Sequence, residues 1–275
     1  MSQTIRVAVL DMYNGEPNQG MRCILDIINR FNQLVTFKIF DIRGKKEFPD
    51  IEKYDIFISS GGPGNPLEGD GNWDHKWYNL IGGLWQHNQK SENKKHILFI
   101  CHSFQMACHY FGVAKITKRK STSFGVMTIH REGHGQDELI YQGLENPFWA
   151  VDSRDYQVVQ PHLEVFEDNG FEIISLEKVR NHVELERAIM GVRFSKEFVG
   201  VQYHPEADPL SFIENLKNKE KRNKIINLKG KEAYLQMLEH LIDEEKIYKT
   251  NATIIPNFLR HAINDVMKSR KSLSN

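Results

Sequence analysis

The chain has 275 residues, of which 40% are hydrophobic, and its 36 basic side chains equal its 36 acidic ones in number. This composition is typical of a folded globular protein, and a net charge of zero removes the electrostatic argument for binding nucleic acid or an anionic membrane. Three cysteines are too few for a disulfide framework, no apolar stretch approaches the ~20 residues of a membrane span, and the N-terminus lacks the features of a signal peptide. We therefore expect a cytoplasmic protein with neither membrane nor nucleic-acid partners.

Segments typical of strands and of helices alternate through the first hundred residues. The strand-like segments are Ile5–Leu10, Val35–Phe40, Tyr54–Ser59 and Ile97–Ile100, and the helix-like segments are Met21–Phe31 and Trp73–His87. Alternation at this pace predicts βαβ units, and hence an α/β fold whose parallel sheet is covered by helices on both faces.

The second part of the chain has a different pattern. Short apolar runs separated by polar turns occur at Val126–His130, Gln157–Val159, Phe171–Ser175, Ala188–Arg193 and Phe198–Tyr203. They predict the strands of a mixed or antiparallel second half of the sheet. Residues 210–275 are helix-like, so we expect one domain over residues 1–209 and a C-terminal helical extension. The lysines between Lys217 and Lys231 are expected to form a solvated face of that extension.

A glycine-rich stretch, SSGGPGNP, follows the third predicted strand at residues 59–66. A Walker loop requires a lysine after the glycines, and none is present. A dinucleotide fingerprint requires a third glycine where Leu67 stands, although Gly62 and Gly64 would match the first two. Two interpretations stay open: a tight turn at the end of a strand, or a loop whose backbone N–H groups hold an anion formed during a reaction.

The sequence ILFICHSFQ places Cys101 where a predicted strand changes into a predicted helix. Such a junction presents its side chain at the carboxyl edge of the sheet, which is the geometry of a nucleophile elbow. The N-terminus of the following helix also favours a thiolate. The alternative is that Cys101 and Cys108 are ordinary buried residues that only pack.

A cysteine nucleophile needs a base, and the base needs a residue that orients it. Residues 198–206 read FVGVQYHPE, an apolar strand that ends close to His204. The imidazole of His204 could accept the thiol proton, and the carboxylate of Glu206 could fix its tautomer. Paired with Cys101 and the glycine loop, this histidine indicates a catalytic group more strongly than it would alone.

SSGGPGNP, ICHSFQ and VGVQYHPE occur in the order and spacing of class I glutamine amidotransferase domains, and residues 5–206 resemble that family. The glutaminase part of GMP synthetase is the nearest general type. The resemblance implies a flavodoxin-like doubly wound sheet with a mixed second half. It further implies that a Cys-His-Glu triad releases ammonia from the glutamine side-chain amide through a glutamyl thioester. The implied roles are nucleophile for Cys101, base for His204, orienting group for Glu206, oxyanion donors for the backbone N–H groups of Gly62 and His102, and substrate binding for Gln105, Arg154 and Tyr156.

Some family positions differ in this chain. The elbow of the family reads Gly-x-Cys-x-Gly-x-Gln, whereas Phe99 and Ser103 replace its two glycines here. We expect the Phe99 side chain to pack in space that the family's glycine leaves unused. We also expect Ser103→Gly to be tolerated, because removal of a Cβ would relieve strain at the turn. Arg154 stands near the position of a family histidine at the substrate rim, where it could favour a carboxylate-bearing substrate.

Three functional alternatives follow from these observations. Nothing after residue 206 resembles an ATP-pyrophosphatase domain, so the chain would either supply ammonia to a separate synthetase or hydrolyse a γ-glutamyl amide as a peptidase does. A third possibility is a catalytically impaired homologue that acts as a binding or regulatory subunit. A metal site built from Cys101, His102, Cys108 and His109 is disfavoured, because two adjacent pairs on one helix do not close a tetrahedron. No metal or cofactor is expected.

Overall fold

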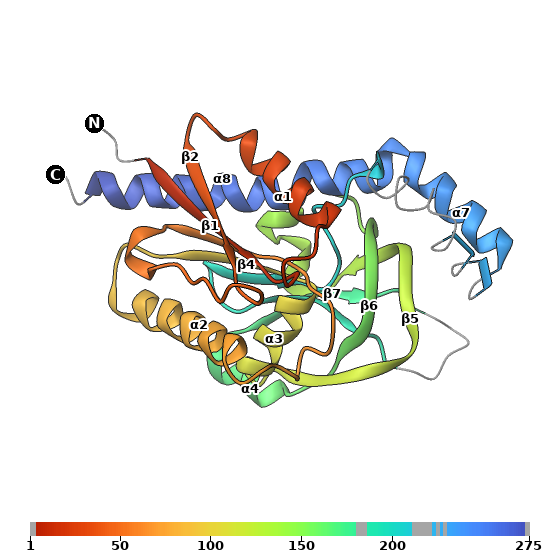
Figure 1. Ribbon diagram of the computed structural model, residues 1–275, viewed down its shortest axis with the longest axis horizontal. Coiled ribbons are helices and arrows are strands. Elements are labelled where there is room, and N and C mark those ends of the chain that lie inside the picture. The colour runs from red at the N-terminus through yellow and green to blue at the C-terminus, as the bar shows by residue number, and fades with distance from the viewer. Residues whose placement is uncertain (1–3, 180–185, 211–221, 224–225, 228–229, 273–275) are drawn as a thin grey trace.

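The computed structural model describes residues 4–179, 186–210, 222–223, 226–227 and 230–272, which form a mixed nine-stranded sheet with helices on both faces (Figure 1). The strands are β1 Ile5–Asp11, β2 Val35–Asp41, β3 Ile56–Ser59, β4 His96–Ile100, β5 Ala114–Arg131, β6 Phe148–Pro161, β7 Glu172–Glu177, β8 Ile189–Arg193 and β9 Phe198–Val201. The α-helices are α1 Gln19–Asn29, α2 Trp73–Lys90, α3 His102–Tyr110, α4 Leu163–Asn169, α7 Lys231–Ile242 and α8 Lys249–Ser272. Short 3-10 helices occupy η1 Ile51–Lys53, η2 Gly133–Gln136 and η3 Leu139–Tyr141, and the π-helix η4 Glu244–Tyr248 joins α7 to α8.

Every strand and helix expected in the first hundred residues is present, with ends shifted by a few residues. Helix α1 illustrates why the local sequence is enough to predict these elements. The side chain of Asn18 accepts a hydrogen bond from the backbone N–H of Met21, at 2.8 Å, and so caps the first turn. Ile24, Ile27 and Ile28 then recur at helical spacing and are fully buried, so the helix has one apolar face directed at the sheet.

The strand order is β2-β1-β3-β4-β9-β8-β7-β5-β6. The first five strands are parallel, in the order of a flavodoxin-like doubly wound sheet, and the remaining neighbours pair antiparallel. The expected fold class is therefore confirmed. Strand β9 pairs parallel with β4 and antiparallel with β8, as the expected mixed second half allows. Its sequence is a short apolar run, which does not specify a neighbour.

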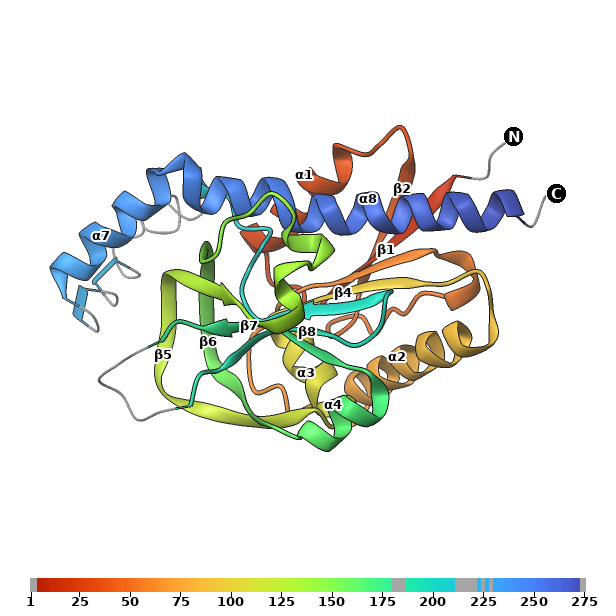
Figure 2. The same cartoon turned by 180° about the vertical axis from the view of Figure 1, so that it is seen from behind.

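Alternate side chains of the parallel strands supply two separate hydrophobic cores. In β4, Leu98 and Ile100 join the core beneath α1 and α8, whereas Ile97 and Phe99 join the core beneath α2, α3 and α4. Figures 1 and 2 show these two helical layers on opposite sides of the sheet. Because both faces are covered, the ligand-accessible part of the parallel half is its carboxyl edge.

Strands β5 and β6 are much longer than the runs that predicted them, with 18 and 14 residues. They form a hairpin whose register shifts between Lys118 and Ser123, so that residues 119–122 bulge from the ladder. Polar residues such as Lys118 and Asp155 interrupt the apolar alternation here, which is why the sequence predicts only the ends of these strands. The hairpin extends beyond the rest of the sheet and forms a wall over its carboxyl edge (Figure 1).

The helices predicted for the C-terminal part of the chain are present as α7 and α8. The predicted lysine-rich face between residues 217 and 231 falls almost entirely outside the described residues. Helix α7 packs on the β5–β6 hairpin, where Tyr234, Met237 and Leu241 share a small third core with Val126 and Val151. Helix α8 crosses the sheet face beside α1, as both ribbon views show (Figures 1 and 2).

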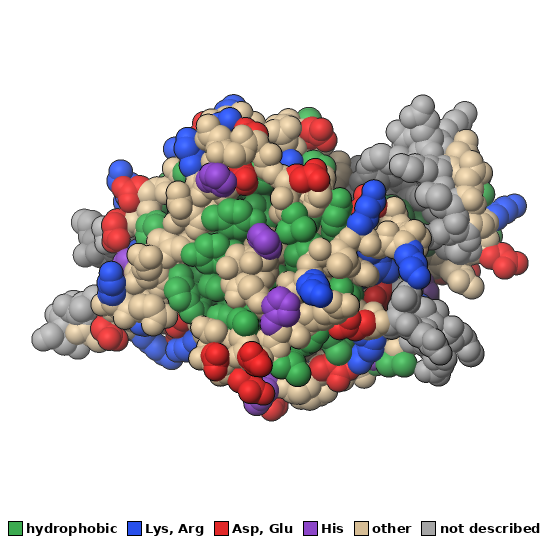
Figure 3. Space-filling model, turned by 90° about the horizontal axis from the view of Figure 1, so that it is seen from below, with side chains coloured by type: hydrophobic (Ala, Val, Ile, Leu, Met, Phe, Trp, Pro, Cys, Tyr) green, Lys and Arg blue, Asp and Glu red, His purple; other side chains and the backbone are tan. Residues whose placement is uncertain are grey.

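The opposite face of the molecule is formed by α2, α3 and α4, and apolar side chains gather on it (Figure 3). Tyr78 and Tyr110 stack there with their ring centroids 5.8 Å apart, and Gly82 leaves room for the Tyr110 hydroxyl. Among the described residues, no helix is both long enough and apolar enough to cross a membrane.

We predict that Gly200→Ala destabilises the fold. Gly200 pairs with Phe99, and a Cβ at this position would lie 2.6 Å from Cδ2 of Phe104 and 3.2 Å from Cβ of Phe99. Overpacking of this kind costs about 1–3 kcal/mol, measurable by urea unfolding. Addition of Phe104→Leu should recover part of the loss, and equal stabilities for Gly200→Ala and the native protein would contradict this packing.

Candidate active site

Cys101 occupies the sharp junction between β4 and α3. Its backbone has φ +50° and ψ −102°, a conformation that is strained for a residue with a Cβ. Its N–H donates to the Val201 carbonyl at 2.8 Å, which continues the β4–β9 ladder to the last residue before the helix. The junction therefore has the nucleophile-elbow geometry expected from the sequence.

Phe99 stands where the family elbow has its first glycine. Its side chain points into the core beneath α2 and α3. Its ring is fully buried and makes edge contacts with Trp77 and Phe194. Gly200 lies opposite Phe99 on β9 and leaves the space that Phe99 and Phe104 fill. The large side chain is thus accommodated by a glycine on the neighbouring strand, and the elbow keeps its turn.

Ser103 replaces the second elbow glycine and forms part of the turn. Its hydroxyl accepts a hydrogen bond from the backbone N–H of Ile100 at 2.9 Å and lies 2.7 Å from the Ser59 carbonyl, to which it donates. All three groups are buried. The expectation that a glycine would be tolerated here stays a prediction, and these buried hydrogen bonds, which a glycine cannot form, argue against it.

His204 reaches the same edge from β9. Its backbone N–H donates to Val151 at 2.8 Å, and its Nδ1 lies 2.8 Å from Oε1 of Glu206. Glu206 is only 1% exposed. Burial lowers the pKa of the His204 imidazole, but the charges of Cys101 and Glu206, with hydrogen bonds to both, outweigh burial and hold that pKa well above its ordinary value.

The side chains of Cys101 and His204 meet above Gly61. A Cβ at Gly61 would lie 2.9 Å from Cε1 of His204, 3.1 Å from the Tyr13 hydroxyl and 3.5 Å from Cβ of Cys101. The glycine therefore makes room for the imidazole beside the thiol. Burial raises the pKa of the Tyr13 hydroxyl, which also interacts electrostatically with His204, Glu206 and Cys101.

A cavity of about 1290 Å³ opens at this edge of the sheet, and every residue that the sequence singled out for the site lines it. These residues are Gly62, Cys101, His102, Gln105, Arg154, Tyr156, His204 and Glu206. Residues 13–23 form one wall, and residues of the β5–β6 hairpin form the other. Cys101 is 5% exposed and the side chain of His204 is 13% exposed, and both line this cavity.

Gly62 and His102 both line the cavity. A Cβ at Gly62 would lie 2.5 Å from the Met12 carbonyl oxygen, so the loop approaches β1 too closely for any other residue. His102 begins α3, where backbone N–H groups have no partner within the helix. Its side chain is buried, and burial, with the charge of Arg43, lowers the pKa of His102 to about 3.

Gln105 connects the elbow to the hairpin. Its Nε2 donates to the Tyr156 carbonyl at 3.1 Å and to Oε1 of Gln202 at 3.0 Å. Gln202 Nε2 lies 3.7 Å from the Cys101 sulfur. This chain of amides holds the hairpin wall against α3 beside the thiol, and Gln202 is a contributor that the sequence did not single out.

Arg154 lines the cavity, but its guanidinium is turned into the protein. The side chain is 1% exposed, its Nε lies 3.0 Å from both carboxylate oxygens of Asp152, and its Nη2 lies 3.7 Å from Glu177. The charge expected to attract a substrate carboxylate is thus already neutralised inside the protein. Any substrate contact at this position would come from the backbone.

Besides Gln202, sequence reasoning missed two further contributors, Tyr13 and Asn251. Tyr13 lies in a polar turn after β1, and only folding brings it to His204. Asn251 lies in the first turn of α8 and donates to the backbone carbonyl of Glu206 at 2.7 Å. Nothing in the local sequence distinguishes either residue from an ordinary loop tyrosine or helix asparagine.

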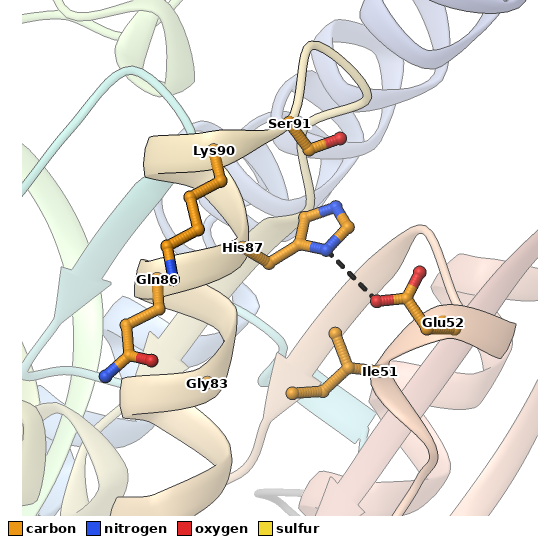
Figure 4. Close-up of a pocket in the computed structure, with 7 residues that line it drawn as sticks. All are labelled: Ile51, Glu52, Gly83, Gln86, His87, Lys90 and Ser91. Atoms are coloured by element: carbon orange, nitrogen blue, oxygen red, sulfur yellow. Dashed lines mark hydrogen bonds and ion pairs between the residues drawn. The ribbon is translucent and has the colours of Figure 1, made fainter.

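The described residues contain no group of three or more His, Cys, Asp or Glu placed to hold a metal ion. A second, smaller hollow of about 320 Å³ lies between η1 and α2 (Figure 4). His87 and Glu52 approach to 3.2 Å at its edge, and Lys90 and Gln86 flank it. No cysteine lines this hollow, so the thiol chemistry expected from the sequence belongs to the larger cavity.

A family model described as glutamine amidotransferase class-I matches residues 23–220. No curated protein matches the chain. A glutamine amidotransferase from Thermotoga maritima shares 18% identity over 95% of this chain and 99% of its own, with a TM-score of 0.68. A Thermoplasma acidophilum protein described as a component of GMP synthase shares 16% identity over all of both chains, with a TM-score of 0.59. The glutaminase domain of Trypanosoma brucei CTPS shares 14% identity over 74% of this chain and 86% of its own, with a TM-score of 0.55.

We predict that Ser103→Gly lowers the free energy of unfolding by about 1–3 kcal/mol, because the buried hydrogen bonds of the Ser103 hydroxyl with Ile100 and Ser59 are lost. Thermal and urea unfolding would measure the loss. Ser103→Ala should lose the same hydrogen bonds without adding backbone freedom, so it separates the two contributions. A glycine variant as stable as the native protein would contradict the role assigned to this hydroxyl.

Proposed function

Because this chain belongs to the class I glutamine amidotransferase family, we propose that it hydrolyses the side-chain amide of glutamine or of another γ-glutamyl compound. Cys101 is the proposed nucleophile, His204 the proposed base and Glu206 the residue that orients it. The observation that carries this proposal is the meeting of thiol and imidazole above Gly61, at the bottom of a single cavity.

The first half of the reaction forms a thioester. The Cys101 thiol gives its proton to His204 as its sulfur bonds to the amide carbon, and negative charge moves to the amide oxygen. Backbone N–H groups of Gly62 and His102 are the proposed donors to that oxygen, and loss of one such donor typically costs about 3–4 kcal/mol. The carbon–nitrogen bond then breaks, and the imidazolium returns its proton to the leaving nitrogen.

The second half releases the acid. A water molecule gives a proton to His204 while its oxygen attacks the thioester carbon, and the carbon–sulfur bond breaks. The sulfur recovers a proton, and glutamate leaves. The charges of Cys101 and Glu206 raise the pKa of His204, which favours transfer of the thiol proton to the imidazole.

Glutamine is the simplest substrate for this chemistry, and its ammonia would pass to a separate synthetase. One of the similar structures is described as part of GMP synthase, which supports a partner of that kind. The size of the cavity favours a second candidate. Its volume of about 1290 Å³ exceeds the roughly 300–1,000 Å³ typical of small-molecule pockets, so a γ-glutamyl amide with a larger amine would also fit.

We predict that Cys101→Ala abolishes release of ammonia from glutamine or of amine from γ-glutamyl peptides. A coupled ammonia assay and an amine assay over a small panel of such amides would measure it. Diazo-oxo-norleucine, an electrophile that mimics glutamine, should label Cys101 and leave the buried Cys108 unmodified. A chain that turns over no γ-glutamyl amide and resists this reagent would instead be a binding or regulatory subunit.

We predict that His204→Asn lowers kcat by at least about 100-fold, within the range typical for loss of a general base, with little change in the unfolding transition. His109→Asn is the matched control, because His109 is exposed on α3 and does not line the cavity. Equal turnover by the His204 variant and the native protein would exclude this residue as the base.

A further inference from the structure

Helix α8 contacts the candidate triad through a buried asparagine, Asn251, which donates to the Glu206 carbonyl. We infer that Asn251, beyond the part of the chain matched by the family model, is a positioning residue that holds Glu206 and thereby sets the orientation of His204. This inference rests on the proposed function, because it assigns a role toward the same triad.

Glu206 needs an external anchor. It follows β9 in a segment that is neither strand nor helix, and its carboxylate is 1% exposed. Oε1 is 2.8 Å from His204, whereas Oε2 is buried without a hydrogen-bond partner among the described residues. The carboxylate is therefore fixed on one side only, and its direction depends on where the backbone of residue 206 is held.

Asn251 supplies that anchor. Its Nδ2 donates to the Glu206 carbonyl at 2.7 Å, the side chain is 3% exposed, and its Oδ1 accepts from Arg30 at 3.4 Å. The asparagine thus links the triad segment to the end of α1. A buried amide whose donor and acceptor are both used has a defined orientation, so it can fix the carbonyl that it contacts.

Thr250, the residue before Asn251, holds the β6 strand that binds the backbone of His204. Thr250 Oγ1 donates to the Trp149 carbonyl at 2.5 Å, and Trp149 lies two residues before Val151, which accepts the His204 N–H. The first turn of α8 therefore holds both pieces of chain that position the imidazole: the β6 strand and the segment of Glu206.

The rest of α8 keeps this first turn in place. Ile254, Phe258 and Ile263 are buried in the core above the sheet. At the far end, Arg270 makes two contacts, at 2.8 and 2.9 Å, with the carboxylate of Asp55, just before β3. The helix thus spans the sheet from the cavity edge to the opposite edge and acts as a rigid support for the triad (Figure 2).

The test compares two asparagines of the same helix. Asn257 also donates to backbone carbonyls, reaching Gln142 at 2.9 Å, but it faces η3 and not the cavity, so Asn257→Ala is the matched control. Asn251→Ala removes the anchor, and Asn251→Asp keeps the shape but lacks the donor. Thermal unfolding of all three variants establishes that they fold.

We expect both Asn251 variants to lower kcat by about 10- to 100-fold with a small change in KM, because a misplaced catalytic group slows chemistry more than binding. Asn257→Ala should match the native enzyme. Equal losses in the Asn251 and Asn257 variants, or no loss in either, would overturn the inference.

A titration by NMR separates this inference from the proposed function, because it needs no turnover. In a Cys101→Ala background, the pKa of His204 should fall when Asn251 is also changed, since a displaced Glu206 stabilises the imidazolium less. The pKa should stay unchanged when Asn257 is changed. An unchanged His204 pKa in the Asn251 variant would overturn the positioning role, whatever the substrate assays find.

Discussion

The parallel pairing of β4 with β9 is the constraint on which the candidate site depends. Ile100 and Val201 are partners in that ladder, and the Cys101 N–H continues it by donating to Val201. Two pieces of chain separated by a hundred residues therefore end at the same edge of the sheet. One ladder fixes where the strained elbow begins and where the strand that leads to His204 stops.

Around this ladder, packing compensates for two unusual residues at the elbow. Phe99 occupies space that Gly200 leaves open on the partner strand, and Ser103 closes hydrogen bonds that join β3, β4 and α3. Both replacements are integrated into the fold, so their presence is compatible with an intact turn. The elbow is held by the core on one side and by a buried hydroxyl on the other.

The cavity is assembled from elements that have little in common in sequence. The β1–α1 turn contributes Tyr13, the long β5–β6 hairpin contributes a wall, and α8 supports the segment of Glu206 from behind. The C-terminal helix thus contacts the site directly. The three side chains of the candidate triad are in this way held by hydrogen bonds from the surrounding backbone and from α8.

The amino-acid sequence alone predicted the first four parallel strands, the position of the elbow and eight of the residues that line the cavity. Periodicity, caps and turn residues act over a few neighbouring positions. The helical spacing from Ile24 to Ile28 and the strand-to-helix change at Cys101 can therefore be recognised in the sequence. Three features became visible only in the folded chain: β9 lies beside β4, Asp152 neutralises the Arg154 charge, and Tyr13 and Asn251 approach His204 and Glu206. These are contacts between distant segments, and no local pattern encodes which neighbours a strand, a charge or an amide will meet.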